Sequence, residues 1–443
     1  KLFECIDTRI ATQNKIIEKL QSLIKGIAQH CIKESTSGNT YVKLGDICQI
    51  TTGKLDANAQ VDNGIYPFFT CAAEPIRCHG YSFDCRAILL AGNGDINNIR
   101  SYNGKFEAYQ RTYVVKIAEP LCFDYIFYWF KYRWFDFNKG KMFGTAIPYI
   151  RLGNLQEFPT PIPPLAEQQR IVDRIESLFA KLDEAKEKAQ AVVDSFEARK
   201  AAILHKAFTG ELTAKWRRTH GLSLDTWKEV AADSLFEYVT SGSRGWAKYY
   251  DESGAVFIRM GNLDHGTIEL DFSDIQHVKL PNKAEGQRSR IRKNDILISI
   301  TADVGMVGLV RNDDFEGYIN QHIALARPVM SESAEFIAWY LVSDIGLKQM
   351  QEKQRGATKV GLSLNDIRAL QLKIPLIEEQ NEILKVIKMW IGKEQQSQEA
   401  AEAVLDQIDL MKKSILARAF RGELGTNDPS EESAVELLKR TIL

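Results

Sequence analysis

Three evenly spaced cysteines are the residues of this sequence that most suggest metal chemistry. Cys71, Cys78 and Cys85 lie seven residues apart, and His79 follows the second of them. Zinc sites usually take their ligands in close pairs about two to four residues apart, and no such pair occurs here. All seven cysteines lie in the first 122 residues, and an odd count without a secretion signal favours reduced thiols. We therefore expect ordinary buried thiols and no metal site, with metal binding as the weaker alternative.

The familiar catalytic motifs are incomplete in this sequence. A nucleotide-binding P-loop needs Gly-Lys followed by Ser or Thr, whereas each Gly-Lys pair here precedes another type of residue. The Gly-Asn-Gly turn at 92–94 lacks the third glycine of a dinucleotide site. The Pro-Pro pair at 163–164 follows Ile162, so it does not match the Asp/Asn-Pro-Pro-aromatic motif of amino-methyltransferases. We expect no catalytic residue in this chain, and a self-sufficient nuclease or methyltransferase is the third-ranked alternative.

Hydrogen bonding to nucleic-acid bases is a chemistry within reach of the polar loop residues. Arg, Asn and Gln side chains can each grip a base edge with two hydrogen bonds, and Lys and Arg can pair with phosphate. For any one residue alone, a surface polar group or a turn former is the simpler interpretation. The candidates are Lys54, Arg77, Asn93, Gln110, Arg111 and Lys141 in the first half of the chain and Arg244, Lys248, Arg259, Asn262, Gln321 and Lys359 in the second.

The sequence repeats itself at a fixed offset of 212 residues. The run Ile-Pro-Pro-Leu-Ala-Glu-Gln at 162–168 returns as Ile-Pro-Leu-Ile-Glu-Glu-Gln at 374–380, and residues 200–212 return as 412–424. A repeat of this length is far beyond a solenoid unit, so it indicates two domain-plus-helix units with approximate two-fold symmetry in one chain. Duplex DNA is the commonest target that is itself a two-part object of fixed spacing.

Two long helices are expected to join the repeated units. Apolar residues recur at steps of four and three through 171–196, which is the heptad seam of a coiled coil. The second copy follows the same seam through 383–415, interrupted by Glu394 and Ser397. A helix of about 40 residues cannot bury such a stripe against a small domain. We expect the two helices to pair in antiparallel fashion, with the globular units at opposite ends.

The globular segments look like two versions of one domain. Short β-rich runs broken by Gly, Asn and Asp predict twisted strands joined by exposed loops. Residues 109–112 parallel 320–323, and the glycine-bearing turn at 52–54 parallels 241–245. We expect α/β (α+β) domains in tandem, separated by long antiparallel coiled-coil helices, with a pseudo-two-fold repeat. The expected segments are an N-terminal helical fragment (1–32, echoing part of the second long helix), a first domain (41–161), a central helix (162–212), a second domain (225–374), a C-terminal helix (375–424) and a tail (425–443).

Composition and charge set the broad class. The 443 residues, 44% hydrophobic and 26% charged, suit a soluble protein of two or three domains, and no apolar run has the length of a membrane span. The start of the sequence lacks a secretory pattern, so we expect a cytoplasmic protein. The net charge of −1 is weak support for nucleic-acid binding. Basic clusters do occur once in each half, at 131–141 and 288–293, where phosphate contact and a solvated loop are comparable interpretations.

The repeated motifs together resemble the specificity subunit of type I restriction-modification systems. They are Ile-Pro-Pro-Leu-Ala-Glu-Gln-Gln-Arg-Ile-Val at 162–172, a long helix, and Ile-Leu-His-Lys-Ala-Phe-Thr-Gly-Glu-Leu at 203–212, whose second copy ends in Ala-Phe-Arg-Gly-Glu-Leu at 419–424. The resemblance spans essentially the whole chain. It implies a non-catalytic subunit with two target recognition domains, each reading one half of a split site in double-stranded DNA.

The resemblance also implies partners. The helices would act as a ruler and as a platform for two modification (methyltransferase) subunits, which bring S-adenosylmethionine, and ATP-driven restriction subunits that use magnesium would complete the complex. The chain itself would hold no cofactor. The matching positions of the platform are Glu167, Gln168, Phe208, Gly210 and Glu211 with Glu379, Gln380, Phe420, Gly422 and Glu423. The fragment at 1–32 departs from the usual layout and leaves the true start open. A coiled-coil adaptor with two protein-binding domains is the alternative function.

Overall fold

The computed structural model describes residues 41–242, 244–280, 286–355, 361–426, 428 and 430. They belong to two compact units, one of which contains Ala191–Ala401 and the other the residues up to Gln190 together with those from Glu402 on. The expected helical fragment at 1–32, most of the tail and Lys359 lie outside the described residues. No helix among the described residues is long and apolar enough to cross a membrane.

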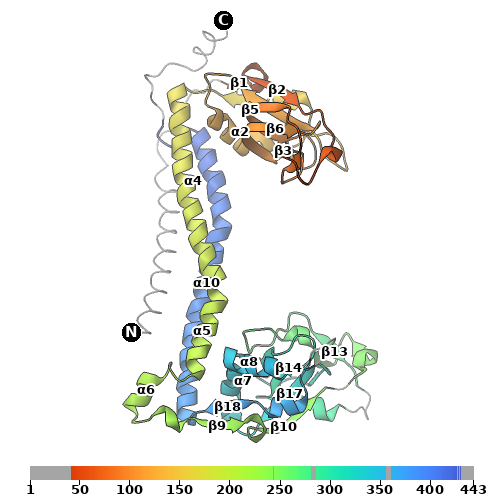
Figure 1. Ribbon diagram of the computed structural model, residues 1–443, viewed down its shortest axis with the longest axis vertical. Helices are drawn as coiled ribbons and strands as arrows, with labels where there is room; N and C mark the ends of the chain where they lie inside the picture. The colour runs from red at the N-terminus through yellow and green to blue at the C-terminus, as the bar shows by residue number, and fades with distance from the viewer. Residues whose placement is uncertain are drawn as a thin grey trace. The chain divides into compact units, whose positions relative to one another are not determined.

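The first domain is a six-stranded sheet with one long helix (Figure 1). Its neighbours pair in antiparallel fashion except β3 and β6, which are parallel. Apolar residues of β5 and β6 form a core with β7, and the helix α2 buries five aromatic or aliphatic side chains. In sheet order the strands are β2 (Cys48–Thr52), β7 (Thr112–Ile117), β5 (Phe83–Ala91), β6 (Ile99–Ala108), β3 (Tyr66–Phe69) and β4 (Ile76–Cys78); the helices are α2 (Phe123–Asn138) and α3 (Leu152–Gln156).

The second domain repeats this arrangement in two four-stranded sheets. One core joins its first sheet and α7 to the long helices of the same unit, through Phe208, Ile383 and Ile387. The first sheet is β10 (Phe236–Ser241), β17 (Ile323–Pro328), β14 (Ile296–Ser299) and β15 (Val307–Leu309), and the second is β11 (Tyr250–Asp251), β13 (Gln276–Val278), β12 (Ala255–Ile258) and β16 (Gly317–Ile319). The helices are α6 (Ala214–Thr219), α7 (Ala334–Val342), α8 (Asp344–Glu352) and α9 (Leu364–Arg368).

The two domains share a topology. The order β2-β7-β5-β6 corresponds to β10-β17-β14-β15, and the parallel pair β3–β6 corresponds to the parallel pair β12–β16. Each domain is also closed by a separate strand pair, β1 (Tyr41–Lys43) with β8 (Pro159–Pro161) and β9 (Lys228–Ala231) with β18 (Gln371–Ile374). Two related domains of mixed α and β structure, joined by long helices, therefore agree with the expected fold class.

The long helices are α4 (Leu165–Asp194), α5 (Phe196–Phe208) and α10 (Ile377–Phe420). The last part of α10 lies beside α4 in one unit, and its first part lies beside α5 in the other (Figure 1). Lys412 pairs with Asp183, whereas Arg170 near the start of α4 donates to Thr426 O at 2.9 Å. Residue numbers thus rise along one helix as they fall along its neighbour, which is antiparallel pairing. The predicted seam of 171–196 is buried at every apolar position.

The central helix bends at Ser195, between α4 and α5, although Ser195 N still donates to Ala191 O at 3.3 Å and Arg199 N to Ser195 O at 3.1 Å. The Ser195 hydroxyl also donates back to Ala191 O, and a side-chain bond of this kind to the carbonyl four residues earlier often bends a helix. Arg199, one turn on, donates to the Ser195 oxygen and to Glu394 Oε2, the latter at 2.6 Å. Glu394 and Ser397, which interrupt the apolar seam of α10, are both buried. Through Glu394 this polar segment contacts α5 next to the bend. A buried polar pair of this kind can fix helix register.

The cysteines agree only in part with the expectation of buried thiols. Among the described residues Cys78 is buried, whereas Cys48, Cys71, Cys85 and Cys122 are half-buried, and all five are free. Burial raises the pKa of the Cys48 thiol to about 12, which keeps it protonated and unreactive.

Candidate nucleic-acid interface

Three of the predicted base-contact residues meet at one corner of the first domain. Asn93 follows β5, and Gln110 and Arg111 form the turn between β6 and β7. Together with Tyr149 and Ile150 they line a hollow of about 450 Å³. Both Gln110 and Arg111 are exposed.

Backbone hydrogen bonds hold the corner. Gly92 N donates to Arg111 O at 2.8 Å, and Ile150 N donates to Gly92 O at 2.9 Å. Phe143 and Tyr149 exchange two further bonds at 2.9 Å across the five-residue loop between them. Three segments of the chain, near residues 92, 111 and 143–150, are therefore hydrogen-bonded to one another, and they carry the side chains that line the hollow.

A glycine is required directly after β2, where the chain passes this corner. A Cβ atom at Gly53 would lie 1.6 Å from Ala108 O, so no other residue fits without moving the end of β6. Gly242 holds the same position in the second domain, where a Cβ atom would lie 2.0 Å from Ile319 O. Lys54 follows directly and is exposed beside the corner turn. The parallel between turns 52–54 and 241–245 thus reflects a close approach of two strands.

The corner recurs in the second domain with different side chains. Ile300 N donates to His322 O at 2.9 Å, and Leu362 N donates to Ile300 O at 2.9 Å, at the same places relative to the strands. Arg355 and Gly361 also exchange two backbone bonds. By this register Asn93, Gln110, Arg111 and Tyr149 of the first domain correspond to Thr301, Gln321, His322 and Gly361 of the second.

The other candidates of the first domain lie away from the hollow. Arg77 on β4 is exposed and donates to Ile65 O at 3.2 Å. The Lys141 ammonium lies 3.5 Å from the centre of the Phe137 ring. Neither residue lines the corner, so the structure gives no shared site for all six predictions.

In the second domain Asn262 is a turn former. It is buried, its amide nitrogen donates to Asp271 O and Asp274 O, and its oxygen accepts from Arg259 N. This placement leaves it unsuited to reach a base, which corrects the sequence-based prediction for this residue. Arg259 itself pairs with Asp274 at 3.0 Å, while Lys248 and Arg244 are exposed.

The second basic cluster surrounds a hollow of its own. Arg288, Arg290 and Arg292 line a space of about 550 Å³ together with Arg327. Arg327 makes two hydrogen bonds of 2.7 Å to the carboxylate of buried Asp295, so its charge is already paired. Burial raises the pKa of Asp295, and the hydrogen bond from Arg327 opposes that rise. Glu237 and Asp313 also line the hollow, but the three remaining arginines leave it a net positive charge.

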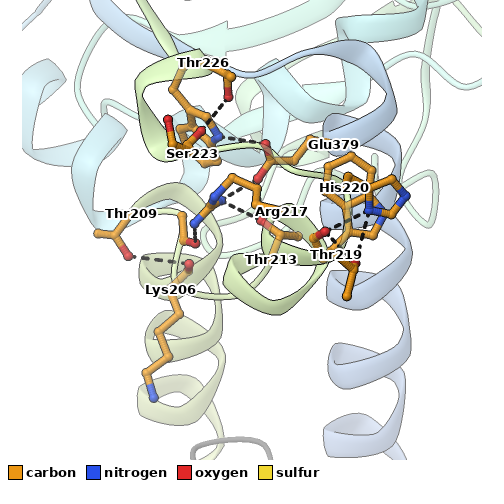
Figure 2. A network of polar contacts seen from close by, with 12 residues as sticks. Lys206, Thr209, Thr213, Arg217, Thr219, His220, Ser223, Thr226 and Glu379 are labelled. Carbon is orange, nitrogen blue, oxygen red and sulfur yellow. Dashed lines mark hydrogen bonds and ion pairs between the residues drawn. The ribbon is translucent and has the colours of Figure 1, made fainter.

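The motif residues at the start of α10 form a buried network (Figure 2). The Glu379 carboxylate is fully buried and accepts hydrogen bonds from Arg217, Thr213 Oγ1 at 2.6 Å and Trp227 Nε1 at 3.0 Å. Arg217 also donates to the carbonyl oxygen of Gly210. The network therefore fastens the segment that follows α5 to the first turn of α10.

The repeated glutamines and phenylalanines have matching internal roles. Gln168 and Gln380 are buried, and their amides donate to the carbonyls of Pro163 and Pro375 at 2.9 and 3.0 Å. Phe420 packs against Trp129 at 5.0 Å between ring centres.

Most of the ten platform residues are therefore buried. Phe208 packs against Phe336 of α7, Gly210 and Gly422 have the positive φ angles that end helices, and Glu167 is buried. Glu211 is exposed, and Glu423 pairs with Arg421. A role of these residues in contact with partners stays a prediction.

A family model described as the type I restriction modification DNA specificity domain matches the chain twice, over residues 36–193 and 225–402. These matches cover more than half of the sequence, so the chain belongs to this family and carries two of its domains. It is a DNA specificity subunit of the type I restriction-modification class.

Two relatives illustrate the range of similarity. The specificity subunit of the type I restriction enzyme EcoDI from Escherichia coli is 26% identical over an alignment of 401 residues that covers 86% of this chain and 88% of that protein. The specificity subunit of EcoBI, also from Escherichia coli, is 27% identical over 63% of this chain and 61% of that protein.

Solved structures support the fold. A chain from a type I R-M system, described for its complex assembly and conformational transition, aligns with a TM-score of 0.60 at 18% identity, over 88% of this chain and 100% of that chain. The HsdS subunit from Thermoanaerobacter tengcongensis aligns with a TM-score of 0.57 at 18% identity, over 89% of this chain and 99% of that chain.

Proposed function

We propose that each domain reads one half of a split duplex DNA site at its sheet corner, and that the paired helices set the gap between the halves. The observation that carries this proposal is the recurrence of one corner backbone on which glutamine is kept, as Gln110 and Gln321, while its neighbours differ. Asn93 and Arg111 of the first domain correspond to Thr301 and His322 of the second. A fixed backbone with exchanged side chains is what two readers of different sequences require.

The chain would act with partners and perform no chemistry itself. Two modification subunits would bind along the helices and bring S-adenosylmethionine, and restriction subunits would add ATP- and magnesium-dependent activity in the cytoplasm. The experiment is to map adenine methylation in cells that express this chain with its cognate modification subunit. We expect one bipartite motif with a constant gap. A continuous motif, or none, would count against the proposal.

The alternative is a coiled-coil adaptor, which a net charge of −1 favours. Competition separates the two functions, because a duplex carrying the mapped bipartite site should displace bound DNA at far lower concentration than a duplex with a scrambled site. Equal displacement by both duplexes would favour the adaptor.

The arginine-lined hollow predicts a salt effect. Replacing Arg288, Arg290 and Arg292 by alanine should reduce the slope of log affinity against log salt by about 2 to 3, because each lost phosphate contact removes about 0.9. The measurement is DNA binding by the full chain with its modification subunit at several salt concentrations. A matched loss of charge elsewhere in the same unit, Lys215, Arg218 and Lys228 to alanine, should leave the slope nearly unchanged. Equal slopes for both triple variants would remove the hollow from the interface.

A further inference from the structure

The corner of the second domain holds a chain of side-chain hydrogen bonds. Gln321 and His322 follow one another in the turn that leads into β17, and Thr301 faces them from the segment after β14. One nitrogen of the His322 ring, Nδ1, bonds with Thr301 Oγ1, and the other, Nε2, lies 2.8 Å from Gln321 Nε2. All three side chains are half-buried.

The chemistry of these contacts fixes the direction of each bond. An amide nitrogen can only donate, so His322 Nε2 must accept from Gln321 and carries no proton. We assign the ring its Nδ1–H tautomer, in which it donates to Thr301 Oγ1. The imidazole thus links a hydroxyl to an amide and holds the amide in one orientation.

The held amide keeps the two groups that adenine recognition needs. Within the described residues no hydrogen bond reaches Gln321 Oε1, and one of its two amide hydrogens is engaged by His322. One acceptor and one donor of the amide therefore remain. That pair matches the N6 donor and N7 acceptor that adenine presents in the major groove, which glutamine can grip with two hydrogen bonds.

We propose that Gln321 reads an adenine in the half-site of the second domain, and that His322 and Thr301 are positioning residues that orient its amide. This inference rests on the proposed function. The first domain has Gln110 at the matching position, but Arg111 and Asn93 replace the imidazole and the hydroxyl. An arginine there can itself bind guanine O6 and N7, so the two corners select different bases.

The test selects binding sites from randomised duplexes with the full chain and its modification subunit. The wild-type complex should enrich a bipartite site in which one adenine, in the half-site of the second domain, is selected by Gln321. In Gln321→Glu the carboxylate can accept from cytosine N4 but cannot donate to N7, so preference at that one pair should move from adenine to cytosine. The loss of adenine enrichment should be about tenfold or more, and the other half-site should not change.

Two further variants separate positioning from mere structure. His322→Ala should keep adenine as the preferred base but weaken its selection, because the amide then turns freely. His322→Asn supplies an oxygen that accepts the same amide hydrogen and should restore part of the selection. Gln321→Met keeps the length of the side chain without its hydrogen bonds, and it should lose preference at the same single pair.

A matched pair of residues on β13 supplies the controls. Gln276 and His277 are also adjacent, and Gln276 Nε2 donates to His277 O at 3.0 Å. Gln276→Glu and His277→Ala should leave every base preference unchanged. If the wild type enriches no bipartite site, the proposed function itself fails. If the wild type does so but Gln321→Glu and Gln321→Met keep the adenine, or lose selection at all positions alike, only the assignment of Gln321 is overturned.

Discussion

Replacing Glu379 by alanine is expected to lower the free energy of unfolding by about 3–5 kcal/mol, because Arg217 would stay buried without its carboxylate. Thr213 Oγ1 and Trp227 Nε1 would lose their acceptor as well. A domain is stable by only about 5–15 kcal/mol, so this is a large fraction of the total. Denaturant unfolding of the full chain, followed by circular dichroism, measures the change.

The neighbouring residue provides the control for this prediction. Glu378 lies on the same turn but is exposed, and Glu378→Ala should change stability by no more than about 0.5 kcal/mol. A double variant, Arg217→Met with Glu379→Leu, removes both charges and should recover much of the loss, since an apolar pair avoids burying an unpaired ion. If Glu379→Ala and Glu378→Ala unfold alike, the network in Figure 2 does not stabilise the junction.

Inserting four residues into α4 beside Ala189 is expected to lengthen the gap between the half-sites without changing either of them. Four helical residues add about 6 Å, close to two base-pair steps. An equal insertion in α10 beside Val404 keeps the two buried seams in step, since Asp183 and Lys412 show that the helices run in opposite directions. Adenine methylation mapping gives the new gap.

A loop insertion of the same size is the control for the ruler. Gly221 lies in an exposed turn after α6 with a positive φ angle and open space around it, so four residues added there should leave the methylated motif unchanged. If the α4 and α10 insertions yield folded protein that still methylates the original spacing, the helices do not set the gap.

The sequence predicted the helical seam well because periodicity is a local property. Each predicted seam position from Ile171 to Phe196 is buried as expected. The bend at Ser195 could not be read in the same way, because the heptad pattern does not show that Arg199 contacts both Ser195 and Glu394 of another helix. An isolated Glu in a heptad indicates only an interruption, and its partner is found in three dimensions.

The clustering of the candidate residues could be predicted from the sequence only in part. Asn93, Gln110 and Arg111 do meet at one corner, but the position matching Arg111 in the second domain, His322, was left out of the candidates. Its alignment with residues 109–112 was the signal that could have found it. Asn262 shows the opposite error, because asparagine suits both turns and base contacts and only burial decides between them.

The repeated glutamate and glutamine at the start of α10 were also placed differently from what the sequence suggested. The resemblance implied that Glu379 and Gln380 belong to a partner-binding platform, and in the structure both side chains are buried and bonded within the chain. A polar residue that recurs in both repeats can therefore mark a hydrogen bond that recurs within the chain. Sequence alone does not separate these two causes, since both place the same residue at the same offset.

The closing strand pairs bear on how this chain is made by the ribosome. With β8 at Pro159–Pro161 the first domain has all the strands that the structure describes, whereas α4 packs beside the last part of α10, which is made much later. More than 200 residues separate the two, which takes roughly 10–40 s at a synthesis rate of about 5–20 residues per second. Throughout that interval the nascent α4 lacks its α10 partner, so the same apolar stripe is available for pairing with a neighbouring chain on the polysome.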